Sequence, residues 1–86
     1  MLTKDHCQAV GVRVTQILCE EREKRGLTKY VVAKRTGLSQ QAIGYLERGI
    51  KRPSLETVLR VAEGIGVDLA AVLRRAKKEA PLKRSK

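Results

Sequence analysis

The chain has 86 residues, the length of one small domain, and carries a formal net charge of +10. Its only aromatic residues are two tyrosines, so the core must be built from Leu, Val, Ile and Ala. A strongly basic chain favours a polyanionic partner such as nucleic acid or an anionic membrane. No apolar segment approaches the roughly 20 residues of a membrane span, and the N-terminus lacks the apolar core of a secretory signal. We therefore expect a cytoplasmic protein with no membrane partner.

The composition also argues against catalysis and against a bound metal. Cys7 and Cys19 form no CxxC motif, and His6 is the only histidine, so no metal site is predicted. Both cysteines fall on one predicted helix, about 18 Å apart, which is beyond the reach of a disulfide. We expect free thiols in a reducing compartment. Because there is also no Ser/His/Asp set and no glycine-rich phosphate loop, the sequence predicts no enzyme, no cofactor and no small-molecule effector.

The hydrophobic pattern and the helix-ending glycines predict five helices and no strand, and therefore an all-α fold. The first helix covers residues 6–25, because apolar side chains recur there at helical spacing before Gly26. Two short helices follow over residues 29–35 and 40–48. Each comes after a residue that can cap a helix N-terminus and before a glycine that can end the helix. The caps are Thr28 and Ser39, and the glycines are Gly37 and Gly49.

Two further helices are predicted over residues 55–64 and 69–78, with Ser54 and Asp68 as N-caps. Pro81 then prevents the last helix from continuing. We expect one domain over residues 1–78, followed by a basic, disordered tail over residues 79–86. The predicted apolar stripes are Leu55, Val58, Leu59, Ala62 and Ile65 on the fourth helix, and Leu69, Val72, Leu73 and Ala76 on the fifth.

The connection between the second and third helices is only three or four residues long, which allows a helix-turn-helix. Such a motif needs a small residue where the two helices cross, and Ala33 meets this need. The turn needs a residue that tolerates positive φ, and Gly37 meets it. Apolar side chains must then hold the next helix against the domain, and Leu38, Ile43 and Leu46 have the required spacing.

The outer face of the third helix has an unusual composition for a surface that only meets water. Gln41, Gly44, Tyr45 and Arg48 share this face, and Gln40 lies on its flank at the N-terminal end. The face holds one cation and no carboxylate. A glutamine amide can bond both N6 and N7 of adenine in the major groove, and the N-terminal end of a recognition helix is the end that meets the bases. The pattern therefore indicates a surface that reads DNA sequence.

Several short motifs between Leu27 and about Leu73 carry a resemblance to a known family. They are Leu27-Thr28-Lys29, Val32-Ala33, Gly37-Leu38-Ser39, Ile43, Leu46-Glu47-Arg48-Gly49, Arg52-Pro53-Ser54-Leu55-Glu56-Thr57 and Gly66-Val67. Together they resemble the phage-repressor (Cro/C1, or XRE-type) helix-turn-helix family, and SQQAI is similar to the opening of the recognition helix in lambdoid repressors. The resemblance implies a compact five-helix, lambda-repressor-like domain that binds operator DNA, usually as a homodimer.

The resemblance also implies roles for individual residues. It pairs Glu47 with Arg22 as a structural ion pair. Two departures stand out, because Gly44 replaces the side chain that most relatives carry there and Glu21 stands where relatives commonly place a leucine. The base-contacting positions are Gln40, Gln41 and Tyr45. The phosphate-contacting positions, with the basic loop after the third helix included, are Thr28, Lys29, Ser39, Arg48, Lys51 and Arg52.

These observations predict a sequence-specific double-stranded DNA-binding transcriptional regulator that occupies a palindromic operator and so blocks or recruits polymerase. We expect a homodimer that joins through the last two helices or through Ile65-Gly66-Val67. One alternative is a protein-interaction module, such as an antitoxin whose helix-turn-helix fold binds a partner protein. Another is a non-specific nucleoid or RNA binder, driven by the tail that follows the last helix.

Overall fold

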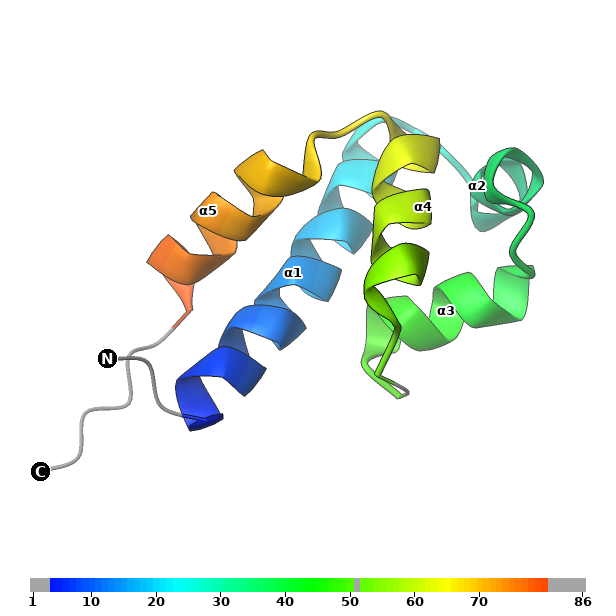
Figure 1. Ribbon diagram of the computed structural model, residues 1–86. Coiled ribbons are helices and arrows are strands. Elements are labelled where there is room, and N and C mark those ends of the chain that lie inside the picture. The colour runs from blue at the N-terminus through cyan, green and yellow to red at the C-terminus, as the bar shows by residue number, and fades with distance from the viewer. Residues whose placement is uncertain (1–3, 51, 81–86) are drawn as a thin grey trace, which may run out of the picture.

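A computed structural model describes residues 4–50 and 52–80, which form five helices and no strand (Figure 1). The helices are α1 (Lys4–Lys24), α2 (Lys29–Thr36), α3 (Gln40–Arg48), α4 (Leu55–Ile65) and α5 (Leu69–Glu79). The predicted all-α fold class is confirmed, and the predicted helix bounds differ from these by at most two residues. None of the described helices is both long enough and apolar enough to span a membrane.

Side-chain caps explain where the short helices begin. The hydroxyls of Thr28 and Ser39 accept hydrogen bonds from backbone N–H groups three residues along the chain, which would otherwise have no partner in the helix. Ser54 caps α4 in the same way. Left-handed glycines explain where two of these helices end, since Gly37 follows α2 with φ 77° and Gly49 follows α3 with φ 68°.

The long helix α1 is the central element of the fold. In Figure 1, α5 lies beside α1 and runs in the opposite direction, while α1 and α4 separate α5 from α2 and α3. All five helices contribute side chains to one aliphatic core. Its most deeply buried members are Ile17, Leu18, Val32, Ile43, Val61, Ala62 and Ala76, each at most 1% exposed.

The apolar stripes predicted on the last two helices are only partly buried. Leu55 and Leu59 are 69% and 44% exposed, whereas Val61 is 1% exposed. The reason is that α4 carries two adjacent apolar rows, and the other helices cover only the row that includes Val61. On α5, Leu73 is 40% exposed, whereas Val72 beside it is 6% exposed. The fold therefore leaves leucines of both predicted apolar stripes at the surface.

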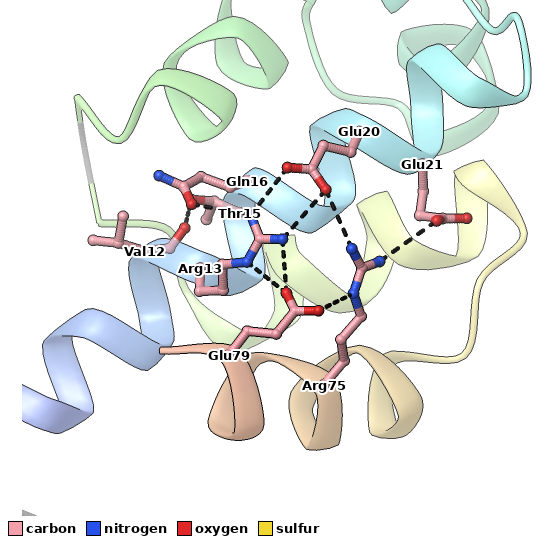
Figure 2. Close-up of polar contacts among 8 residues, drawn as sticks. All are labelled: Val12, Arg13, Thr15, Gln16, Glu20, Glu21, Arg75 and Glu79. Carbon is pink, nitrogen blue, oxygen red and sulfur yellow. Dashed lines mark hydrogen bonds and ion pairs between the residues drawn. The ribbon is translucent and has the colours of Figure 1, made fainter. Parts of the chain in front are cut away.

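Helix α5 continues through Glu79, so the predicted domain boundary after residue 78 falls inside this helix. Ala80, which follows it, is 5% exposed and belongs to the core. The Glu79 carboxylate accepts hydrogen bonds from Arg75, one turn earlier, and from Arg13 of α1, at 2.9 and 2.8 Å (Figure 2). These two bonds lower the pKa of Glu79, with the one from Arg75 contributing most. Residues 81–86 of the predicted tail lie outside the described residues.

A set of ion pairs joins α1 to α5 (Figure 2). Arg13 lies between Glu20 and Glu79, at 3.0 and 2.7 Å. Arg75 contacts Glu20 at 3.4 Å and Glu21 at 3.8 Å. These side chains are partly open to water, so each pair contributes little stability and is screened by salt. Glu21, which replaces the leucine expected from the family resemblance, therefore has a polar partner on α5.

Helices α2 and α4 pack closely against each other at Gly64, a crossing that was not predicted from the sequence. An ideal Cβ on Gly64 would lie only 2.6 Å from Cγ2 of Thr36. The Thr36 side chain cannot rotate away easily, because its hydroxyl donates to the Val32 carbonyl at 2.8 Å and accepts from the Leu38 N–H at 3.2 Å. Arg35 also donates to the Gly64 carbonyl at 3.0 Å. A side chain at Gly64 would therefore push α2 and α4 apart.

We expect Gly64→Ala to lower the free energy of unfolding by about 1–3 kcal/mol, the usual cost of overpacking a fixed core. Urea denaturation followed by circular dichroism measures the loss. Thr36→Ser removes Cγ2 and keeps the hydroxyl, so the double variant Gly64→Ala/Thr36→Ser should recover most of it. A single variant Gly64→Ala as stable as the wild type would contradict this account of the crossing.

Candidate nucleic-acid interface

The turn between α2 and α3 is held by three local hydrogen bonds. The Gly37 N–H donates to the Ala33 carbonyl at 2.9 Å, and the Leu38 N–H donates to the Thr36 hydroxyl at 3.2 Å. The Ala42 N–H then donates to the Ser39 hydroxyl at 3.0 Å and starts α3. On the inner face of α3, Ile43 and Leu46 are buried at 0% and 2% exposed. These contacts fix α3 against the domain with its opposite face outward.

Three side chains are ordered along the outer face of α3. The Gln41 amide donates from Nε2 to the Tyr45 hydroxyl oxygen at 2.6 Å. The Arg48 guanidinium lies over the ring of Tyr45, 5.8 Å from its centroid. Because this bond uses one of the two N–H donors of Gln41, the amide oxygen and the second N–H are not part of it. The outer face therefore offers a donor and an acceptor side by side, held by the residue one turn further on.

Gly44 lies on this face, as predicted, but it is buried. An ideal Cβ at Gly44 would lie 3.7 Å from Nη2 of Arg48 and 3.8 Å from Nζ of Lys29. Arg48 also donates from Nε to the Gly44 carbonyl at 3.3 Å. The end of the Lys29 side chain, from α2, and the end of the Arg48 side chain, from α3, thus meet over the bare backbone of Gly44.

A shallow hollow of about 390 Å³ opens beside the outer face of α3. It is lined by Ser39, Gln41 and Tyr45 from the turn and α3, and by Arg52 from the loop that follows α3. The structure therefore brings two predicted base-contacting residues together with two predicted phosphate-contacting residues. Lys29 and Arg48 form a second group, over Gly44.

The remaining predicted contacts lie at the edges of this surface. Gln40 is exposed at the first position of α3 and does not line the hollow. Thr28 is exposed and uses its hydroxyl to cap α2, where it accepts from the Val31 N–H at 3.1 Å. Lys51 lies outside the described residues.

Arg22 and Glu47 form a two-bonded ion pair between α1 and α3. The Arg22 guanidinium donates from Nε and Nη2 to the two carboxylate oxygens of Glu47, at 2.6 and 3.1 Å, and from Nη1 to the Leu27 carbonyl at 2.7 Å. The two side chains are 10% and 5% exposed. The hydrogen bond with Glu47 raises the pKa of Arg22. Glu47 therefore points into the domain and leaves the outer face of α3 without a carboxylate.

Cys19 is a neighbour of this pair that was not identified from the sequence. Burial raises the pKa of its thiol, and a hydrogen bond with Glu47 raises it further. Both effects disfavour the thiolate, so Cys19 has the surroundings of a structural cysteine rather than a reactive one. The sequence could have indicated this proximity, because Cys19 lies three residues before Arg22 and both side chains therefore lie on the same side of α1. Cys7 is exposed, and both cysteines are free.

A short helix, a glycine turn and a second helix with a polar outer face define a helix-turn-helix protein, the class that places its second helix in the major groove of DNA. The chain belongs to the XRE-type helix-turn-helix family, because residues 20–72 match the family described as "Helix-turn-helix". This is a family of transcription regulators and not of enzymes. The matched segment contains both partners of the Arg22–Glu47 pair and the whole of α2, α3 and α4.

A curated relative supports the same classification. Over 46 residues the chain is 41% identical to the protein named "Uncharacterized HTH-type transcriptional regulator y4dJ" of Sinorhizobium fredii (strain NBRC 101917 / NGR234). The alignment covers 54% of this chain and 60% of that protein. No solved structure matches the chain.

Because the Arg22–Glu47 pair is buried, Glu47→Ala should lower the free energy of unfolding by about 3–5 kcal/mol, since it leaves the Arg22 charge without its partner. Glu56 offers a matched control, because its carboxylate pairs with Arg60 at 3.9 Å and is 80% exposed. Glu56→Ala should cost only about 0–1 kcal/mol. Chemical denaturation of both variants measures the difference, and equal losses would show that burial of the pair has no energetic consequence.

Proposed function

We propose that this protein binds double-stranded DNA with sequence specificity, as a homodimer on a palindromic operator, and regulates transcription from the site it occupies. The observation that supports this most is the outer face of α3. It carries the ordered Gln41–Tyr45 hydrogen bond, no carboxylate, and cations at its border. A solvated helix has no need of such an arrangement, whereas a helix that reads base edges does.

In this proposal α3 enters the major groove with its N-terminal end toward the bases. Gln40, Gln41 and Tyr45 contact base edges, and Gln41 bonds N6 and N7 of an adenine. Phosphate contacts around them fix the register of the helix and carry no sequence information. The proposed phosphate contacts are Thr28, Lys29, Ser39, Arg48, Lys51 and Arg52. The dimer bound at its operator then blocks or recruits polymerase, in the cytoplasm.

Exposed apolar side chains on α1, α4 and α5 support a dimer, because pairing two copies through them would remove these side chains from water. They border a groove of about 630 Å³ between α1, α4 and α5, where Val12, Leu55 and Leu73 are 53%, 69% and 40% exposed. The segment Ile65-Gly66-Val67 exposes less apolar surface for a dimer contact, because Ile65 is only 3% exposed. The same groove is what favours the alternative function, in which it binds a partner protein, as it would in an antitoxin.

Base readout by Gln41 predicts a sequence-dependent loss on substitution. Gln41→Ala should cost about 1–3 kcal/mol on the preferred duplex and relax the preference at one base pair in each half-site. Lys29→Ala, in contrast, should weaken binding to every duplex about equally. Selection from a random duplex pool identifies the preferred site, and titrations at one fixed salt concentration measure each variant on matched, single-mismatch and unrelated duplexes. If Gln41→Ala weakens all three equally, Gln41 does not read a base.

The dimer proposal predicts that Leu55→Ser/Leu73→Ser weakens self-association at least about tenfold, because each leucine loses a favourable burial of about 1.5–3 kcal/mol. Sedimentation equilibrium measures the dimer constant, and thermal melting at low concentration should show an unchanged monomer fold. Leu59→Ser is the control, since Leu59 is 44% exposed but does not line this groove. A wild-type protein that sediments only as a monomer, with and without operator DNA, would contradict the proposal.

A further inference from the structure

Gly44 occupies the middle of α3, where glycine is among the least favourable residues for a helix. The backbone does not require it, because Gly44 is not one of the glycines with positive φ. Packing does not require it either, since the nearest atoms that a Cβ would meet lie 3.7 and 3.8 Å away, at ordinary contact distance. The fold would therefore accept an alanine here, and the reason for a glycine must be sought in binding.

Both atoms nearest to the Cβ position of Gly44 belong to cationic groups. They are Nη2 of Arg48, from α3, and Nζ of Lys29, from α2. Among residues 4–50 and 52–80, no carboxylate forms an ion pair with either group. Two like charges that converge on one point repel each other unless an anion lies between them. The arrangement therefore has the chemistry of an anion site that lacks only its anion.

We propose that Gly44 is the floor of a seat for one phosphate of the DNA backbone, which Lys29 and Arg48 bind together. The proposal rests on the DNA binding proposed above and assigns one contact within it. An oxygen that accepts charge-assisted hydrogen bonds from both nitrogens lies about 2.7–2.9 Å from each, close to the point that a Cβ would fill. The absence of a side chain lets the phosphate reach the helix backbone.

A shared phosphate would also have a mechanical effect. Lys29 lies in the first turn of α2 and Arg48 in the last turn of α3, so one phosphate would join the two ends of the helix-turn-helix. Contacts of this kind set the position of a protein on the duplex. The seat would fix how deeply α3 enters the groove, and therefore which atoms Gln41 can reach.

Gly44→Ala tests the seat, and Gly11→Ala controls for the effect of an alanine on helix stability alone. Gly11 is an exposed glycine inside α1, and a Cβ there would meet nothing within 4 Å. Because Gly11 lines the groove proposed for the dimer, it controls for stability and not for DNA binding. Both variants should raise the melting temperature by about 4–8 °C, because alanine favours the helix. Gly44→Ala should weaken binding by about tenfold relative to the wild type, on the selected duplex and on an unrelated duplex alike. The slope of the logarithm of its DNA-binding constant against the logarithm of salt concentration should also become shallower by about 0.9, the value for one phosphate contact.

A double variant separates the shared seat from an indirect effect. Lys29→Ala should weaken binding about tenfold in the wild type but hardly at all in Gly44→Ala, because the phosphate that it contacts is already displaced. If Gly44→Ala binds DNA like the wild type, the seat is wrong while the proposed function stands. If it weakens binding only on the selected duplex, the group over Gly44 is a base and not a phosphate. If the wild type binds neither duplex, DNA binding and the seat are both wrong.

Discussion

The ion pair between Arg22 and Glu47 is the contact on which the placement of the recognition helix depends. Arg22 uses three donors at once, two on the Glu47 carboxylate of α3 and one on the Leu27 carbonyl just before α2. One side chain of α1 thereby positions both helices of the helix-turn-helix. A buried ion pair adds little net stability compared with apolar packing, but its geometry is demanding. In a core with no large aromatic rings, we infer that this directional contact sets the orientation that aliphatic packing leaves loosely defined.

The inward turn of Glu47 has a direct consequence for the opposite face of α3. A carboxylate on that face would repel phosphate, whereas the face instead carries Tyr45 in contact with both Gln41 and Arg48. Side chains that are already ordered lose less conformational freedom on binding, so less of the interaction energy is spent on arranging them. The same pair therefore supports recognition twice, because it orients α3 and keeps negative charge away from its outer surface.

The parts of the structure that could be predicted from the sequence are the locally determined ones. Thr28, Ser39 and the glycine after α2 act within one helical turn, so helix bounds and the turn followed directly from neighbouring residues. The exposure of Leu55 could not be predicted in this way, because α4 has two apolar rows and the position of the other helices decides which is covered. Within the site, the proximity of Cys19 to Glu47 also depends on tertiary placement.

Gly44 and Gly64 show why residue type alone could not settle the interpretation of the site. Both are helical glycines, yet a Cβ on Gly64 would meet a threonine methyl at 2.6 Å, whereas a Cβ on Gly44 would meet only the flexible ends of two cations at 3.7 and 3.8 Å. The first glycine is required by the fold, and the second lowers helix stability without a packing reason. Functional surfaces commonly retain residues that lower stability where a larger side chain would obstruct binding. If the proposed seat is right, Gly44 is the place on α3 where a backbone phosphate of DNA comes close.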